Sequence, residues 1–238
     1  MPKLGAVATM ATLVVTKDCT ALSDADLAEM SELCGGSGRA FEIGILSKQA
    51  EAWVLVTLAR DDVGALTGYS FCTLERIGGT PSVLIGLASI GPTADREEVL
   101  DAIVRDQMRR AVLAFPDEDV LVGSRLAAPS TFQAFAGFND IIPRPGHKAS
   151  GEERAWGRRL AKRFGIETSA YNDRSFTVIG DGSLPPIFDY VAPDHHEVHT
   201  EVAAFFAELD IDNGDVLIGF GWAMAEDLDA LLKETGPF

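Results

Sequence analysis

The sequence predicts an α/β protein with a mixed, mostly antiparallel sheet flanked by helices, followed by a C-terminal α+β extension. Three β-rich segments, at 53–60, 66–74 and 82–90, are separated by short turns, which is typical of an antiparallel meander. Residues 97–115 predict a long helix, because their apolar side chains recur at helical spacing. A further apolar segment at 120–126 predicts the next strand. Strands and helices in this order indicate the α/β class.

The segments before the meander predict one strand and one helix. Residues 11–16 are rich in β-branched side chains, which favours a strand. Ser23 is a candidate N-cap, and the acids after it suit the dipole of a helix that begins there. The glycine-rich stretch 35–38 predicts the loop that ends this helix. Residues 41–48 fit either a short helix or a strand, and both stay open.

Shorter elements are expected after the strand at 120–126. Residues 130–136 predict a short helix with Gly137 at its C-terminus. The proline-containing stretch 142–146 marks a connection. We therefore expect an N-terminal domain over residues 1–145 and an acidic extension over 146–238 packed on it. Within the extension the sequence predicts a helix at 152–164, a strand at 176–179, a helix at 198–209, a strand at 216–220 and a helix at 225–233.

The composition is that of a soluble globular protein, with 47% hydrophobic and 24% charged residues among 238. No apolar run reaches the length of about 18 residues that a membrane span needs, so we expect no membrane contact. The three cysteines, Cys19, Cys34 and Cys72, form no Cys-x-x-Cys pair. We therefore expect neither a disulfide framework nor a zinc site built on cysteines, and we expect a cytoplasmic protein.

The formal net charge of −16 bears on the choice of partner. It argues against nucleic acid, whose phosphates require clustered lysines and arginines. An acidic surface can steer a cationic substrate, and it can equally serve solubility alone. The helix at 152–164 has the opposite charge on its polar face, with Arg154, Arg158, Arg159, Lys162 and Arg163. This face is either solvated or an interface for a phosphate, an acidic partner or the acidic tail, and the last option allows a homodimer.

Three local motifs carry a resemblance to a known family. Leu66-Thr67-Gly68-Tyr69 begins the second strand of the meander, and residues 82–90 form its third strand. The stretch Ser130-Thr131-Phe132-Gln133-Ala134-Phe135-Ala136-Gly137-Phe138 ends the N-terminal domain with Gly-Phe. In this order, residues 11–145 resemble the GCN5-related N-acetyltransferase (GNAT) superfamily. The resemblance implies a GNAT-like fold in a divergent member of that superfamily.

The resemblance also implies an acyl-transfer site. In that family the fourth and fifth strands splay apart, the pantetheine arm of acetyl-CoA lies between them, and its pyrophosphate meets amides at the start of the next helix. It therefore implies acetyl-CoA or another acyl thioester as cosubstrate. The cofactor-binding candidates are Ala88, Ser89, Ile90, Arg96, Glu97 and Phe135. Glu75 is the candidate base for the amine proton, and Gln133 stands where a tyrosine commonly protonates the leaving thiolate.

Two features depart from the pattern of the family. The loop from Gly91 to Glu98 lacks the glycines that let a backbone wrap a pyrophosphate. It also places Asp95, Glu97 and Glu98 where phosphates would lie, although Asp95 and Glu98 fit a capping box. Gln133 is no general acid at neutral pH. The sequence thus predicts either an enzyme with altered donor contacts or a fold that has lost the chemistry.

Three of the four histidines lie together at 195–199. His195 and His199 are four residues apart, a spacing that metal ligands use on a helix. The cluster lacks the His-Glu-x-x-His motif, and Pro193-Asp194 fits an ordinary helix start. Metal binding, a substrate or general-base role for one histidine, and a plain helix start stay open, and we expect no metal site.

The sequence therefore predicts transfer of an acyl group from a CoA-type thioester to the amine of a small molecule. The acidic surface favours a cationic amine. Two alternatives stay open. One is a non-catalytic or regulatory GNAT-fold binding protein, and the other is a GNAT-like enzyme of specialised metabolism that uses a different donor.

Overall fold

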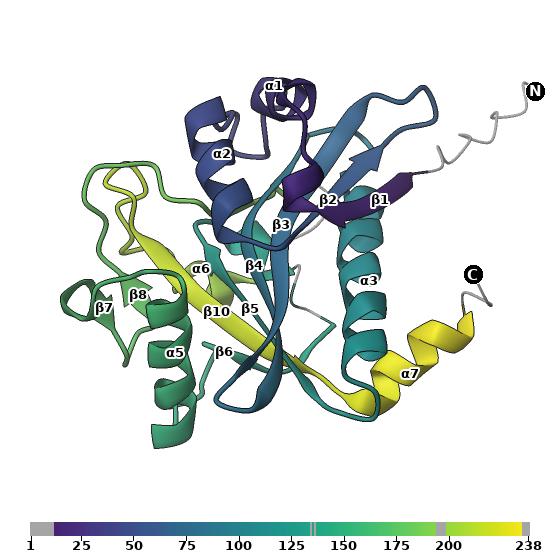
Figure 1. Ribbon diagram of the computed structural model, residues 1–238. Coiled ribbons are helices and arrows are strands. Elements are labelled where there is room, and N and C mark those ends of the chain that lie inside the picture. Colours follow the sequence, from purple (N-terminus) through teal and green to yellow (C-terminus); the bar gives the residue numbers. More distant parts are fainter. Residues whose placement is uncertain (1–11, 134, 136, 194–198, 235–238) are drawn as a thin grey trace, which may run out of the picture.

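The computed structural model describes residues 12–133, 135, 137–193 and 199–234. Its centre is a mixed sheet with helices on both faces (Figure 1), which confirms the predicted fold class. The strands are β1 (Leu13–Asp18), β2 (Leu55–Arg60), β3 (Leu66–Ile77), β4 (Thr80–Ile90), β5 (Val120–Leu126), β6 (Asn139–Ile142), β7 (Tyr171–Asn172), β8 (Thr177–Val178), β9 (Phe188–Asp189) and β10 (Val216–Ala223). The helices are α1 (Asp24–Glu32), α2 (Ile43–Ala52), α3 (Arg96–Ala114), α4 (Pro129–Gln133), α5 (Gly151–Arg163), α6 (Thr200–Ala203) and α7 (Ala225–Glu234), with single 3₁₀ turns η1 (Cys19–Ala21) and η2 (Thr168–Ala170).

The pairing of the strands changes from antiparallel to parallel at the centre of the sheet. Strands β1 to β4 are antiparallel neighbours, which confirms the predicted meander. Strand β4 is parallel to β5, and the short β9 is parallel to both of them. Strand β10 then runs antiparallel to β5, β6 and β8. The meander and the second half of the sheet therefore meet at β4 and β5, where the donor site was predicted.

Helices cover the two faces of the sheet in two groups. Figure 1 shows α3 and α7 on one side of the sheet, and α2 and α5 on the other. The neighbours of two glycines in the sheet agree with this arrangement. The side of Gly68 that has no side chain faces Val99 and Ile103 of α3, whereas that of Gly86 faces the ring of Trp53 at the end of α2. Leu160 of α5 also packs on this second face. None of the described helices is long and apolar enough to cross a membrane.

The C-terminal part of the chain enters the same sheet. Strand β10 pairs with β5 along the whole length of β5, from Leu217 opposite Leu126 to Ala223 opposite Val120. It also pairs with β6, so the chain between β6 and β10 forms a long insertion in one strand pair. This insertion carries α5, β7, β8, β9 and α6. The division of the chain at residue 145 stays a prediction.

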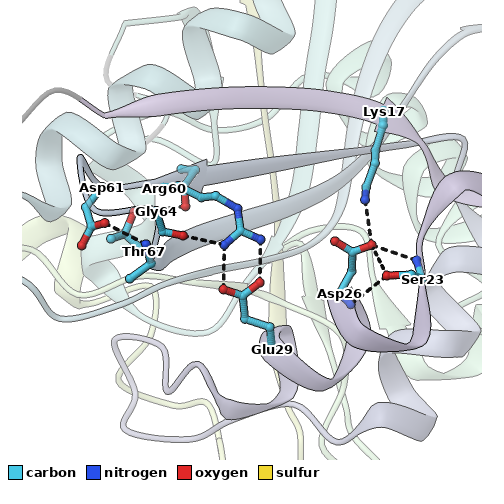
Figure 2. A network of polar contacts seen from close by, with 10 residues as sticks. Lys17, Ser23, Asp26, Glu29, Arg60, Asp61, Gly64 and Thr67 are labelled. Carbon is cyan, nitrogen blue, oxygen red and sulfur yellow. Dashed lines mark hydrogen bonds and ion pairs between the residues drawn. The ribbon is translucent and has the colours of Figure 1, made fainter.

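Polar contacts fix α1 against the edge of the sheet (Figure 2). Ser23 is the N-cap of α1, as predicted, and it forms a capping box with Asp26. Asp26 also accepts a hydrogen bond from Lys17 of β1. That bond is the main reason why the pKa of the Asp26 carboxyl falls to about 2. Arg60 of β2 holds Glu29 with two hydrogen bonds of 2.6 and 2.5 Å. These pairs hold α1 against β1 and β2, and the glycine-rich loop at 35–38 follows α1 in the chain.

The structure decides one open alternative and corrects three local expectations. Residues 41–48 fit the helix alternative, because α2 begins at Ile43. The strand predicted from residue 53 begins at Leu55. The predicted helix at 198–209 is wrong in length, because α6 covers Thr200–Ala203 and turns follow it. Asp95 is the N-cap of α3 but makes no side-chain cap bond. Its backbone angles, φ −98° and ψ 19°, are not the extended ones that a capping side chain uses, so no capping box forms there.

Candidate active site

The candidate site is the place where β4 and β5 separate. The two strands pair directly from Ser82 to Ile85 of β4. At the end of this stretch, the Ser124 hydroxyl donates to the carbonyl of Ile85 (2.9 Å), and Arg125 donates to the carbonyl of Gly86 (2.7 Å). Burial lowers the pKa of the Arg125 guanidinium to about 10. Beyond this point the strands no longer pair with each other, as the resemblance to GNAT proteins implies.

The gap between the separated strands is filled by the chain itself. Strand β9 enters it in parallel with both neighbours, with Phe188 opposite Ala88 of β4 and Leu126 of β5. The amide of Ala88 donates to the carbonyl of Ile187 at 3.0 Å. The side chains of Phe188 and Tyr190 are each only 1% exposed. A donor that lay between β4 and β5 would therefore have to take the place of this segment.

Three predicted cofactor residues contact one stretch of the insertion, which we call the plug segment (residues 187–192). The Ala88 amide donates to the carbonyl of Ile187, and Ser89 lies opposite Asp189 in the strand pair. Arg96 donates from Nε to the carbonyl of Val191 (2.8 Å) and from Nη2 to that of Ala192 (3.3 Å). The structure thus brings these residues together, and their partner is the protein's own backbone.

The N-terminus of α3 faces the other end of the plug segment. Glu97 and Glu98 lie in the first turn of the helix. Burial, and then the Glu97 carboxylate, raise the pKa of the Tyr190 hydroxyl to about 12. The acids predicted to disfavour a pyrophosphate are therefore in place at this helix end.

Two other predicted cofactor residues belong to the core. Ile90 is 1% exposed and lies opposite Gly68 in the sheet. Phe135 is also 1% exposed and packs edge-on against Phe138, with 5.7 Å between the ring centroids. Gln133 is the last residue of α4, and its side chain lies outside the described part of the structure.

Glu75, the candidate base, lies far from the gap. It pairs with Ser82, at the end of β4 where β4 and β5 are still joined. The strand from Ser82 to Ser89 spans about 20 Å. The Glu75 carboxylate accepts a hydrogen bond from Arg163 of α5 at 2.7 Å. The structure therefore does not bring Glu75 to the gap between β4 and β5, which we call the donor groove.

A buried carboxylate at the gap was not found by sequence reasoning. Asp189 is 4% exposed and accepts bonds from the Ser37 amide (2.9 Å) and the Ser37 hydroxyl (2.8 Å). Burial raises the pKa of the Asp189 carboxyl, and the bonds from Ser37 oppose this rise. The Ser89 hydroxyl beside it is buried and makes no hydrogen bond among the described residues. The Tyr69 hydroxyl is also buried and makes no hydrogen bond among the described residues, and burial raises its pKa.

The loop at 35–38 closes over this carboxylate, which the sequence presented only as a helix end. A Cβ on Gly35 would lie 2.1 Å from Oδ2 of Asp189 and 2.6 Å from the Ser89 hydroxyl. A Cβ on Gly36 would lie 2.2 Å from the amide nitrogen of Val191. Glycine is needed at both positions because the loop backbone touches the plug segment.

The remaining candidates make no site among the described residues. Asp194, His195, His196, Glu197 and Val198 lie outside them, and His199 is the exposed N-cap of α6. Within the described ranges, no group of three or more histidine, cysteine or acidic side chains is arranged to hold a metal ion. The cysteines are unpaired, and burial raises the pKa of the Cys19 and Cys72 thiols to about 12.

Known proteins resemble this chain only distantly. No family model and no curated protein matches the chain. Among solved structures, the ribosomal-protein-S18-alanine N-acetyltransferase from Escherichia coli is 10% identical, with 59% of this chain and 86% of that chain covered and a TM-score of 0.40. The IAA acetyltransferase from Bacillus cereus is 11% identical (55% and 80%, TM-score 0.38). The GNAT family N-acetyltransferase YhbS from Escherichia coli, in complex with CoA, is 15% identical (57% and 73%, TM-score 0.40).

The order of the elements defines the class of the protein. A meander, a long helix, a parallel fifth strand that separates from the fourth, and a short helix form a GNAT-like α/β fold. This arrangement is the one that the resemblance to GNAT proteins implies for the fold. The solved structures are too distant to carry an argument about activity, so we argue the function from the contacts at β4 and β5.

Proposed function

We propose that this chain is a GNAT-fold binding or regulatory protein that holds its own donor groove closed and does not transfer acyl groups in this conformation. The observation that carries the proposal is the hydrogen bond from the Ala88 amide to the carbonyl of Ile187. On the resemblance to GNAT proteins, an amide of this strand would polarise the thioester of the donor. Here the Ala88 amide, which belongs to this strand at the gap, is already paired.

Opening the groove is costly for two physical reasons. Phe188 and Tyr190 would leave the core, and exposure of one large apolar side chain costs about 1.5–3 kcal/mol. The Asp189 carboxylate would also lose its bonds to Ser37. Any pyrophosphate that then reached α3 would meet Glu97 and Glu98. Each of these terms favours the closed form over a complex with CoA.

A thermal-shift experiment with acetyl-CoA tests this proposal. A donor with a Kd of about 10 μM would raise the Tm by about 5–10 °C at about 1 mM, because binding to the folded state stabilises it. We expect no shift for the unaltered protein and no turnover on a panel of amines. A shift of that size together with acyl transfer would refute the proposal.

A second candidate function, acyl transfer after release of the plug segment, rests on Asp189. This carboxyl belongs to the residue opposite Ser89, near the end of β4, and has a raised pKa; buried groups with shifted pKa values are common at catalytic sites. The acceptor would then be the amine of a small molecule, and the acidic surface favours a cationic one. Under this alternative the variant Phe188→Ala should gain a Tm shift with acetyl-CoA. The matched control Val191→Ala, whose side chain is exposed, should not.

A further inference from the structure

A large cleft lies in the insertion, away from the donor groove. Its volume is about 1170 Å³, and its walls are the loop from β6 to α5, the β7–β8 hairpin and the chain around α6. None of the predicted cofactor residues lines it. The cleft exceeds the usual upper size of small-molecule sites, which is about 1,000 Å³.

The cleft gathers positive charge in a strongly acidic protein. Among the described residues that line it there are two acids, Glu208 and Asp215, and four cations from three elements: Arg144, Lys148, Arg154 and Arg174. Asp215 already accepts bonds from the Gly180 amide (2.8 Å) and the Asn213 side-chain amide (3.0 Å), which lower the pKa of its carboxyl against the effect of burial. Its charge is therefore satisfied by the turn that holds it.

Three of the cations lack an acidic partner among the described residues. Arg144 lies between Asp140 (3.4 Å) and Glu153 (3.8 Å). In the described ranges, Lys148, Arg154 and Arg174 form no ion pair with any carboxylate. Two arginines of the same insertion outside the cleft are paired, since Arg158 binds Asp173 and Arg163 binds Glu75. Three cations without an ion pair among the described residues therefore line this hollow surface.

The lining of the cleft also has an apolar part. Phe176, Val178 and Phe205 contribute rings and methyl groups to it. Phe176 has a φ of +61°, a backbone conformation that is rare for a bulky side chain. It is held there by packing against Phe220, with 6.1 Å between the ring centroids. Strained residues of this kind cluster at ligand sites.

We propose that this basic cleft, whose lining includes Arg144, Lys148, Arg154 and Arg174 together with Phe176, Val178 and Phe205, binds a small organic phosphate with an apolar body. Guanidinium groups match phosphate oxygens in charge and in hydrogen-bond geometry. The apolar lining takes the rest of the ligand, because burial of a ring or chain there removes it from water. The inference is independent of the donor groove and holds whether or not that groove opens.

Calorimetric titration tests the cleft with three probes: phenyl phosphate, hexyl phosphate and inorganic phosphate. We expect both organic phosphates to bind about tenfold or more tightly than inorganic phosphate, because only they use the apolar lining. Arg174→Gln and Lys148→Gln should each weaken phenyl phosphate binding by about tenfold, the usual worth of a hydrogen bond to a charged group. The control Lys162→Gln removes an exposed cation of α5 outside the cleft and should change nothing.

Three results would overturn this inference: no binding of either organic phosphate at about 5 mM, which corresponds to a free energy of binding weaker than about 3 kcal/mol; equal affinity for inorganic and organic phosphate; or equal effects of Arg174→Gln and Lys162→Gln. Acetyl-CoA serves as a fourth probe. Binding that survives Arg174→Gln and Lys148→Gln but increases in Phe188→Ala would place it in the donor groove, and would refute the proposed function alone.

Discussion

Phe188→Ala is expected to destabilise the protein by about 3–5 kcal/mol, the usual cost of truncating a buried phenylalanine. Phe188 is 1% exposed and lies between Ala88 of β4 and Leu126 of β5. The truncation leaves a void where the buried ring was. The void lies at β9, which among the described segments is the strand that bridges β4 and β5 beyond Ile85. Urea denaturation measures the change as a shift of the midpoint.

The control for this prediction is Val191→Ala in the same plug segment. The Val191 side chain is 36% exposed, and its contact with Arg96 runs through the backbone carbonyl, which the substitution keeps. We expect a change of about 0.5 kcal/mol or less, as for most surface positions. If Phe188→Ala cost no more than Val191→Ala, the plug segment would not be part of the folded core.

Gly35→Ala has the second-largest expected effect, a loss of about 1–3 kcal/mol. The new Cβ would lie 2.1 Å from Oδ2 of Asp189, so the carboxylate would have to leave the Ser37 amide and hydroxyl. A buried carboxylate without its partners is unfavourable. Thermal denaturation near neutral pH measures the loss as a lower Tm.

Gly44→Ala is the matched control, because it adds the same methyl group in a helix with nothing within 4 Å. Replacement of a helical glycine by alanine should stabilise the protein by about 0.5–1 kcal/mol. A Gly35→Ala variant as stable as the unaltered protein would mean that the loop at 35–38 does not close on Asp189.

Local sequence signals predicted the elements that frame the site. Alternation and short turns gave the meander, and the Ser23 cap gave the start of α1. The separation of β4 and β5 was implied by the resemblance to GNAT proteins, which rests on the motifs at 66–69, 82–90 and 130–138. These features depend on residues close together in the sequence, which is why pattern reasoning reached them.

The occupant of the gap could not be predicted in the same way. Strand β9 has two residues, Phe188 and Asp189, and so has no periodicity to detect. Its position depends on pairing with strands far away in sequence. The Glu75–Arg163 pair has the same origin, because α5 brings Arg163 to the far end of β3. Contacts between distant segments therefore decided whether the predicted donor residues are available.

Hydrogen exchange at the Ala88 amide tests the central claim most directly. The account predicts a strongly protected amide in the free protein, because it donates to Ile187 within the core, and no change on addition of acetyl-CoA. An Ala88 amide that exchanges like an exposed one in the free protein, and becomes protected only with acetyl-CoA, would contradict the account. That result would mean that the groove is open and that the donor, not the chain, pairs with β4.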